Sequence, residues 1–345
     1  MSYVYLSSLI QPRILLLVCI ILQLTGCMKQ EIESPEWPQF LAAFMQPDGR
    51  VIDSGQDNMT HSEGQGITML LAVIYNDPET FSRVWNWTQE HLQVRSDKLL
   101  AWSWLPDGGV SDQNNATDGD LLVTWALALA AKQWNKKEYL EEAISISKDI
   151  RTKLVREDKR GLVLIPGNEG FERPDHLIVN LSYWVFPALL ELEKIDPSDQ
   201  WQTLRNTGIK LLKESRFGRW GLPPDWLETG ETLTPAKEFP VRFGYDAVRI
   251  PLYLIWAKLD TPSLLEPYKK FWGYFSGARF IPAWTNLADD SIDSHDMSQG
   301  MRAIVHLSMA APGRPKNPLP ALAEDETYYS AAMLLLSKAV IADRF

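Results

Sequence analysis

The chain has 345 residues, of which 45% are hydrophobic, 23% charged and 11% aromatic, a composition that excludes a disordered or fibrous protein and suits a soluble enzyme. The formal charge of −10 argues against a nucleic-acid groove or an anionic membrane surface as a partner, because binding phosphate groups requires clustered Lys and Arg. The 14 Trp, 12 Phe and 11 Tyr residues provide more flat apolar surface than a core of this size needs, so some rings are expected to face an uncharged ligand such as a polysaccharide.

The N-terminal segment has the features of a lipoprotein leader. Arg13 precedes an apolar stretch over 14–22 that is too short to span a bilayer. The stretch is followed by Leu24-Thr25-Gly26-Cys27, which resembles a bacterial lipobox whose Cys becomes the lipid-modified first residue of the mature protein. Plain secretory cleavage with an incidental Cys27 is the alternative. The other cysteine, Cys19, also lies in the leader, so the body has no disulfide, zinc–thiolate site or Cys nucleophile.

We therefore predict a lipoprotein signal peptide over residues 1–26, a tether over 27–35 and a folded catalytic domain over 36–345. Acylation of Cys27 would hold the protein on a membrane without spanning it. Met28, where inner-membrane lipoproteins carry Asp, resembles outer-membrane sorting. The predicted location is the bacterial envelope, at the outer membrane and facing the periplasm.

The body shows helix-length amphipathic or apolar runs and almost no alternating strand pattern. The runs cover residues 36–46, 62–75, 79–94, 119–133, 137–152, 177–193, 198–214, 244–258, 263–274, 297–309 and 325–341. Apolar runs alternate with charged ones, as expected when one ring of helices encloses another. Six helical hairpins would use the whole mature chain, so we predict one all-α domain. The longer connections, where binding residues are expected, cover 98–117, 154–176, 215–242 and 275–296.

Carboxylates stand at the first turns of three apolar runs, at Glu63, Asp118 and Asp246. Each can be explained by helix capping, because acids near a helix N-terminus are favoured by the helix dipole. Gly64 and Gly66 weaken that explanation, since a glycine within a helix costs roughly 1 kcal/mol relative to Ala. These glycines predict the close approach of another backbone or of a ligand.

Six short motifs occur in order along the body. They are His61-Ser62-Glu63-Gly64-Gln65-Gly66, Leu100-Ala101-Trp102-Ser103-Trp104, Asn115-Ala116-Thr117-Asp118-Gly119-Asp120, Asn180-Leu181-Ser182-Tyr183-Trp184, Gly221-Leu222-Pro223-Pro224-Asp225-Trp226 and Tyr245-Asp246-Ala247-Val248-Arg249-Ile250-Pro251-Leu252. Together they resemble the motifs of glycoside hydrolase family 8, and within it the endo-β-1,4-glucanases associated with bacterial cellulose synthesis. The resemblance implies an (α/α)6 barrel with its cleft at one end of the inner helices, which agrees with six hairpins.

The resemblance also implies roles for the three acids. Glu63 matches the general acid that protonates the leaving glycosidic oxygen, and Asp246 matches the general base that activates water on the opposite face of the sugar. Asp118 matches an acid described either as a nucleophile or as a ligand of the distorted central sugar. Because most of the family inverts the anomeric centre, we assign Asp118 to sugar binding and Asp246 to the base role. Inversion needs room for water, typically about 6.5–9.5 Å between the carboxyl groups of acid and base.

Aromatic rings in or beside the motifs are predicted to stack on glucose rings, whose axial C–H faces are apolar. The predicted substrate-binding residues are Trp102, Trp104, Tyr183, Trp184, Trp226, Tyr245 and Arg249, and Trp220 and Trp284 also lie in or beside connections. For any single Trp, packing in the core is the competing explanation, and we expect it for Trp85, Trp125 and Trp134 on helical runs. Arg249, one helical turn after Asp246, is expected either to pair with a carboxylate or to be structural.

No cofactor and no metal site is predicted. The acidic segment 289–296 lacks the spaced Gly and the terminal Glu of an EF-hand and is expected to be a solvated loop. The sequence contains no HExxH pair, no GxSxG elbow and no phosphate-binding Gly loop. Because these patterns are absent, the sequence does not support a zinc enzyme, a serine hydrolase or a kinase.

The function that the resemblance implies is an endo-β-1,4-glucanase that inverts the anomeric centre, acts as a monomer on a cellulose-like glucan, and has the cellulose synthase and export machinery as a candidate partner. Substitutions relative to the family pattern at Gly66, Val123, Thr124 and Leu181 leave the substrate preference open. Mixed-linkage glucan, chitosan and xylan are the alternative substrates. A catalytically silent glycan-binding lipoprotein is the alternative from another class.

Overall fold

The computed structural model describes residues 34–344. Its helices are α2 (Glu36–Phe44), α3 (Ser62–Ile74), α4 (Pro78–His91), α5 (Thr117–Trp134), α6 (Lys137–Lys153), α7 (Phe186–Ile195), α8 (Asp199–Glu214), α9 (Ile250–Trp256), α10 (Pro262–Tyr274), α11 (Gln299–Ala310) and α12 (Tyr328–Arg344). Two short 3₁₀ turns, η1 (Leu181–Tyr183) and η2 (Ala247–Arg249), precede α7 and α9.

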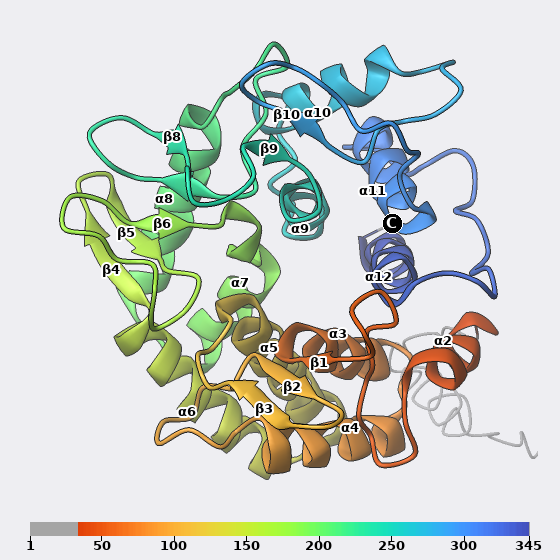
Figure 1. The fold of residues 1–345 in the computed structure, drawn as a ribbon. Coiled ribbons are helices and arrows are strands. Elements are labelled where there is room, and N and C mark those ends of the chain that lie inside the picture. The colour runs from red at the N-terminus through yellow and green to blue at the C-terminus, as the bar shows by residue number, and fades with distance from the viewer. Residues whose placement is uncertain (1–33, 345) are drawn as a thin grey trace, which may run out of the picture. The chain divides into compact units, whose positions relative to one another are not determined.

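The helices form two concentric layers. Helices α3, α5, α7, α9, α11 and α12 each pack against the next, and α12 returns to α3 to close an inner ring (Figure 1). Helices α2, α4, α6, α8 and α10 lie outside it. The inner helices α3 and α5 are buried over most of their length, whereas α6 and α8 bury one face each. This arrangement confirms the predicted all-α (α/α)6 barrel.

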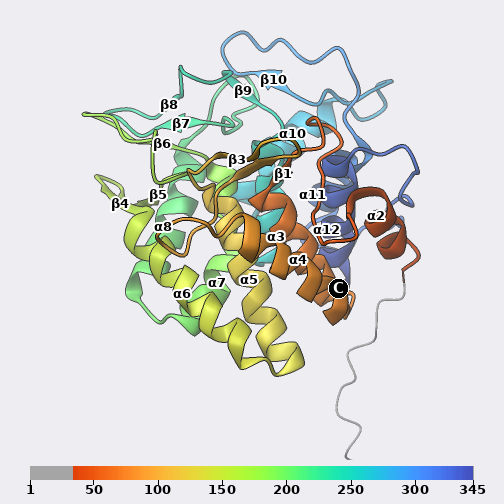
Figure 2. The same ribbon diagram turned by 60° about the horizontal axis from the view of Figure 1, so that its bottom comes forward.

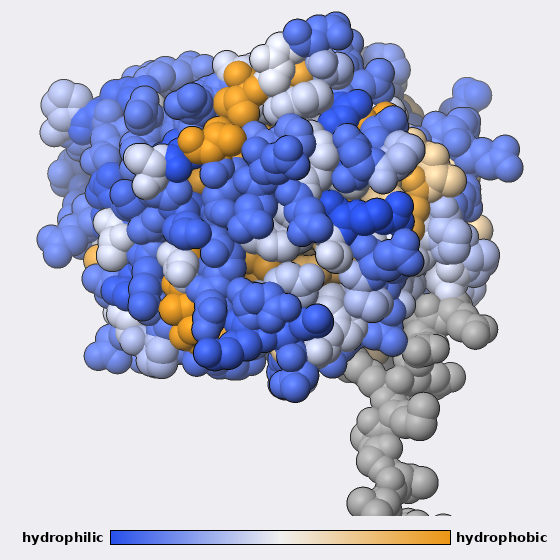
Figure 3. Space-filling model, turned by 90° about the horizontal axis from the view of Figure 1, so that it is seen from below, coloured by the Kyte–Doolittle hydropathy of each residue, from blue (hydrophilic) through white to orange (hydrophobic). Residues whose placement is uncertain are grey.

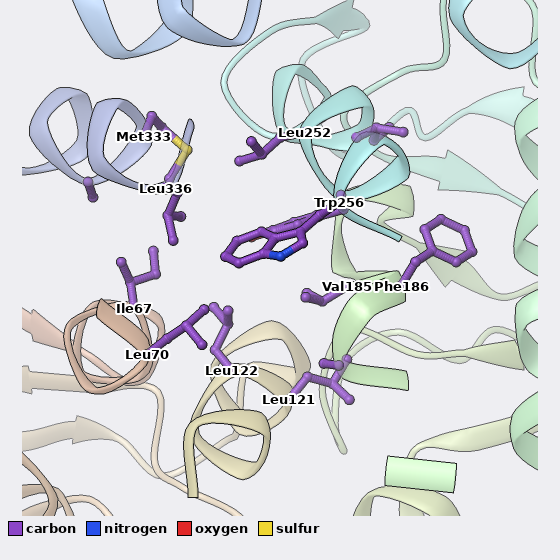
Figure 4. Close-up of a cluster of buried hydrophobic side chains, with 14 of the residues drawn as sticks. Ile67, Leu70, Leu121, Leu122, Val185, Phe186, Leu252, Trp256, Met333 and Leu336 are labelled. Atoms are coloured by element: carbon purple, nitrogen blue, oxygen red, sulfur yellow. The ribbon is translucent and has the colours of Figure 1, made fainter. Parts of the chain in front are cut away.

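The centre of the ring is filled with apolar side chains. Figure 4 shows Ile67 of α3, Leu122 of α5, Leu252 and Trp256 of α9 and Met333 of α12 pointing toward one another. None of these five is more than 8% exposed. The barrel is therefore a packed core rather than a channel, and a substrate can reach it only at an end.

Most of the short strands gather at one end of the ring, above the helices in Figure 2. The strands are β1 (Thr60–His61), β2 (Ser103–Leu105), β3 (Gly109–Asp112), β4 (Val155–Asp158), β5 (Gly161–Leu164), β6 (Ile178–Val179), β7 (Leu227–Glu228), β8 (Thr234–Pro235), β9 (Arg242–Phe243) and β10 (Thr285–Asn286). They pair antiparallel as β1-β2-β3, β4-β5, β6-β7-β8 and β10-β9. Strands this short show no alternation of their own, which is why the hydrophobic pattern did not predict them.

Two predicted helices begin later than expected. The run 177–193 is helical only from Phe186, because the Asn180 side chain accepts a hydrogen bond from Ser182 N (3.0 Å) and forms a turn before Pro187 opens α7. The run 244–258 begins with a turn and η2, and α9 follows. The other runs agree with the observed helices to within three residues at each end.

The inner helices begin at the strand-covered end. Tyr328 at the start of α12 donates a hydrogen bond to the carbonyl of Gly64 at the start of α3 (3.1 Å). The N–H of Gly300 at the start of α11 donates to Ser330 Oγ at the start of α12 (3.0 Å). The first turns of these helices therefore lie together, and the positive ends of their dipoles favour anionic groups at this end of the barrel.

The face of the molecule seen in Figure 3 is mostly hydrophilic, with small and separate apolar patches. Within residues 34–344, no helix combines the length and the apolar character needed to cross a membrane. The predicted signal peptide 1–26, Cys27 and most of the tether lie outside the described residues, so the leader stays a prediction.

Candidate active site

Glu63 and Asp118 are neighbours because the first turns of α3 and α5 are in contact. A Cβ on Gly66 would lie only 2.7 Å from Leu122 Cβ and 3.0 Å from Val123 N. The glycine thus permits the close approach of a second helix, which is one of the two explanations that the sequence left open. The contact places two carboxylates from different helices at the same end of the barrel.

His61 caps α3 two residues before the predicted acid. Its Nδ1 accepts a hydrogen bond from Gly64 N (2.9 Å), and its Nε2 lies 3.1 Å from Asp53 Oδ2. An accepting Nδ1 carries no proton, so Nε2 is the nitrogen that donates to Asp53. His61 lies in one of the six sequence motifs, but no role was predicted for it, because a histidine that caps a helix has no characteristic sequence spacing.

A buried arginine joins the three predicted acids. Arg249 Nη1 contacts Glu63 Oε1 and lies 3.2 Å from Asp118 Oδ2, while Nη2 lies 2.9 Å from Asp246 Oδ1. Nη2 also donates to Ser182 Oγ at 3.0 Å. Arg249 is 2% exposed. Three carboxylates from three segments of the inner ring therefore converge on one guanidinium, and Arg249 pairs with carboxylates as the sequence allowed.

The cluster holds more negative than positive charge. Three carboxylates share a single guanidinium, so full ionisation would leave a net negative charge in a partly buried site. Burial raises the pKa of Asp118 to about 7. Burial, followed by repulsion from Asp225 and Asp118, raises the pKa of Asp246 well above its usual range. Near neutral pH the cluster can therefore hold a proton, and these shifts place it on Asp118 or Asp246.

Three predicted binding residues lie beside this cluster. The Trp102 carbonyl accepts a hydrogen bond from Ser62 N (3.0 Å), which places Trp102 next to Glu63. The Tyr183 ring centre lies 5.8 Å from the Arg249 guanidinium carbon. Tyr245, which precedes Asp246 in the chain, is 42% exposed. Each of the three is at least partly exposed, so each is available to a ligand.

Two further predicted tryptophans pack against other aromatic rings of the protein. Trp104 meets Trp87 edge-on at 5.4 Å between ring centres. Trp226 is stacked on Phe239 at 4.1 Å and on Phe171 at 5.8 Å. Both tryptophans keep partial exposure. They remain candidates for sugar binding, with much of their ring surface already in contact with the protein.

The prediction for Trp184 is wrong. This side chain is 1% exposed, and its Nε1 donates a hydrogen bond to the Leu204 carbonyl at 3.1 Å. It packs so closely on α8 that a Cβ on Gly208 would lie 2.4 Å from its Cδ1. No ring face is free for a sugar. Core packing, the competing explanation for any single Trp, also holds for Trp85 and Trp125.

Three other tryptophans are buried or only partly exposed. Trp134 is half-buried against the core, as expected for a helical Trp. Trp220, which lies in a connection, is buried at 8% exposure beside Tyr274. Trp284 is partly buried, and its Cβ lies 3.2 Å from where a Cβ on Gly244 would stand.

The acidic segment 289–296 is a largely exposed loop, as predicted. Two of its acidic side chains accept hydrogen bonds from nearby backbone N–H groups. Asp290 Oδ1 accepts a hydrogen bond from Arg219 N (3.0 Å), and Asp293 Oδ1 accepts one from His295 N (3.1 Å). In the part of the chain that the structure describes, no group of three or more His, Cys, Asp or Glu side chains is arranged to hold a metal ion.

A closed double ring of helices that brings a cluster of carboxylates together at one end suits a glycoside hydrolase. The family described as glycosyl hydrolases family 8 matches residues 13–341. The chain belongs to this family.

Relatives agree with this assignment. A probable endoglucanase of Novacetimonas hansenii is 38% identical over 307 residues, which cover 87% of this chain and 88% of that protein. The structure of the endo-β-1,4-glucanase CMCax from Acetobacter xylinum superposes with a TM-score of 0.84 at 37% identity, covering 90% of this chain and 97% of that one. The endoglucanase Cel10 of Klebsiella pneumoniae, a family 8 glycosyl hydrolase, gives a TM-score of 0.85 at 36% identity, covering 90% of this chain and all of the other.

Proposed function

We propose that this protein is an endo-β-1,4-glucanase that hydrolyses internal bonds of a cellulose-like glucan with inversion. The convergence of Glu63, Asp118 and Asp246 on Arg249 carries the proposal. The relatives are named as endoglucanases, and this supports the substrate class. A neutral glucan also suits a protein with a net charge of −10, because it brings no charge of its own to the acids.

The reaction is a single displacement. Glu63 donates a proton to the glycosidic oxygen as the bond to the anomeric carbon breaks, and Asp246 takes a proton from the water that forms the new bond on the opposite face. Asp118 binds the sugar between them. Glu63 and Asp246 contact different nitrogens of Arg249, so the guanidinium lies between acid and base. After turnover Glu63 is ionised and Asp246 protonated, and exchange with solvent restores both.

Hydrolysis of carboxymethyl-cellulose tests the activity. An endo-acting enzyme lowers viscosity steeply while few reducing ends appear. The variant Glu63→Gln should lower kcat by at least about 10³-fold while folding and cello-oligosaccharide binding persist. Glu90→Gln, which changes an exposed carboxylate on α4, is the matched control and should act like the unmodified enzyme. Full activity of Glu63→Gln would remove Glu63 from the acid role.

Substrate preference is decided by comparative rates. We expect carboxymethyl-cellulose and cello-oligosaccharides to be cleaved faster than barley mixed-linkage glucan, chitosan or xylan. Retention on a glucan affinity gel without release of reducing sugar would instead identify a glycan-binding protein without catalysis.

We place this activity at the cell envelope, as a monomer with Cys27 acylated. The Leu24-Thr25-Gly26-Cys27 sequence and the Met that follows support a lipid-anchored protein at the outer membrane that faces the periplasm, where nascent glucan and the cellulose synthase and export machinery would be accessible. Metabolic labelling with an alkyne fatty acid should mark the protein, and Cys27→Ser should abolish both label and membrane retention. A labelled and membrane-bound Cys27→Ser protein would contradict the anchor.

A further inference from the structure

A buried carboxylate that the reaction does not use lies beneath the predicted base. Asp225, in the Gly-Leu-Pro-Pro-Asp-Trp motif, is 2% exposed. Its Oδ1 accepts hydrogen bonds from Gly244 N (2.8 Å) and Ala247 N (2.9 Å). These two amides flank Asp246 in the chain, so one oxygen of Asp225 closes the turn that carries the base.

The other contacts of Asp225 fix it in place. Its Oδ2 accepts from Arg242 Nε (3.1 Å), and its backbone N–H donates to the Arg242 carbonyl (2.8 Å). Gly244 packs against this carboxylate so closely that a Cβ there would lie 3.0 Å from Oδ2. With three donors from side chain and backbone, Asp225 is held by the same segment that it orders, and neither can move alone.

Besides Asp225, the Asp246 turn is held by a hydrogen bond from Val248 N to the Gly244 carbonyl (3.0 Å) and by one from the Tyr329 hydroxyl to the Tyr245 carbonyl (2.5 Å), and Arg249 binds the Asp246 carboxylate. Asp246 precedes η2, which is three residues long, and it makes no side-chain capping bond. A short 3₁₀ turn has poorer hydrogen-bond geometry than an α-helix and little rigidity of its own. The precision that an acid–base pair needs must therefore come from outside the turn.

We propose that Asp225 is a positioning residue that clamps the Gly244–Ala247 turn and so fixes the Asp246 carboxylate for its role as base. The inference rests on the proposed function, because it assigns Asp225 a role in that reaction. Asp225 does not touch the reacting atoms, and it acts through the turn.

The negative charge of Asp225 adds a second effect on the base. Several charged, titratable or polar groups face Asp246, and they are Asp118, Asp225, Arg242, Arg249, Tyr183, Tyr329 and Asn180. After burial, Asp225 is the largest contributor that raises the pKa of Asp246. A raised pKa makes the ionised carboxylate a stronger base but moves the acidic limb of activity to higher pH.

Two substitutions separate these effects. In Asp225→Asn the amide oxygen can still accept from both backbone N–H groups, but the charge and the hydrogen bond from Arg242 are lost. Asp225→Ala loses the clamp as well. We expect Asp225→Ala to lower kcat by about 100-fold with KM little changed, as for a base displaced by about 1 Å. Asp225→Asn should lower kcat less and move the acidic limb of the kcat/KM profile to lower pH by about half a unit or more.

The matched control is Asp196→Asn. Asp196 is also buried and paired with an arginine, Arg151 (2.8 Å), but it lies at the opposite end of α7 from Tyr183. Its variant should lose stability and keep the unmodified pH profile. The position of a pH limb does not depend on the fraction of enzyme that is folded, so it separates positioning from folding.

Titration of the Asp246 side-chain carboxyl by ¹³C NMR reads the same effect without catalysis, with Asp246→Asn for assignment. A midpoint lower in Asp225→Asn than in the unmodified protein is expected. An unchanged midpoint, together with kcat falling only in proportion to the folded fraction, would overturn the role of Asp225. Absence of hydrolysis of every β-glucan by the unmodified protein would instead overturn the proposed function, and the NMR comparison would still decide on Asp225.

Discussion

Gly119 of α5 lies directly against Ser62 of α3. A Cβ on Gly119 would stand 2.1 Å from Ser62 Oγ and 2.8 Å from Glu63 N. Real Cβ atoms do not approach other atoms this closely, so the two first turns fit only with glycine at this position. The contact fixes the distance between α3 and α5. It lies next to both acids in the chain, because Glu63 follows Ser62 and Asp118 precedes Gly119.

Substitution of Gly119 should therefore damage both activity and stability. Gly119→Ala is expected to destabilise the fold by about 1–3 kcal/mol through overpacking and to lower kcat by at least tenfold. Urea unfolding and steady-state rates measure both. Gly108→Ala is the control, since a Cβ on Gly108 meets nothing within 4 Å. Equal losses in the two variants would show that the Gly119 contact does not set the site.

The His61 cap should matter for the position of Glu63 two residues later. His61→Ala leaves Gly64 N without its acceptor, at a cost of about 1 kcal/mol. It should also lower kcat, because the first turn of α3 frays. His61→Asn restores a side-chain oxygen at the cap and should recover most of the rate. If Ala and Asn variants were equally impaired, the cap would not be the reason for the histidine.

Removal of the shared cation should move the pH profile upward. In Arg249→Met the three carboxylates lose their only common counter-charge, so each holds its proton more tightly. Asp246 must be ionised to act as a base, and the acidic limb of kcat/KM should shift to higher pH while kcat falls about 100-fold. Arg151→Met, which breaks a partly buried pair with Asp196, should change stability only. A profile unmoved by Arg249→Met would contradict the charge balance described above.

Asp118 should reduce stability at neutral pH. Its pKa is about 7 in the fold against an ordinary 3.8, so between these values the folded state binds more protons than the unfolded state. Stability is greatest below about pH 4 for this group and is lost as the pH rises through 7. Asp118→Asn removes the titration.

Urea unfolding at pH 4.5 and 7.5 measures the effect. Asp118→Asn should lose less stability over this interval than the unmodified protein, by on the order of 2 kcal/mol. Glu90→Gln should show the unmodified slope. The same slope in Asp118→Asn would mean that Asp118 is ionised throughout.

The sequence predicted the helices well because each inner helix carries a long apolar run. Composition alone predicts that residues 121–131 of α5 are buried, and all of them except the partly buried Leu129 are. The positions that it misjudged depend on hydrogen bonds from backbone groups to side chains. Asn180 accepts a hydrogen bond from a backbone group two residues away and forms a turn, and the apolar periodicity extended the predicted run 177–193 through it. Asp225 holds the turn at the start of the predicted run 244–258 by hydrogen bonds to backbone groups that are near it only in space.

The acids were predicted from the family motifs, and their convergence on Arg249 was not. An arginine one turn after an aspartate is common on helices, and nothing in that spacing reveals contacts with Glu63 and Asp118. Trp184 illustrates the opposite error. It stands in a motif beside Tyr183, but the η1 turn directs the two adjacent side chains to different surroundings, one to the acid cluster and one to α8.

The stereochemistry of the first product tests the central claim most directly. The claim is that Glu63 and Asp246 act as acid and base in a single displacement. ¹H NMR of cellohexaose hydrolysis, recorded before mutarotation, should show the new reducing end first as the α anomer. Initial appearance of the β anomer would show retention through a covalent intermediate, and would contradict the assignment of Asp246 as a base for water.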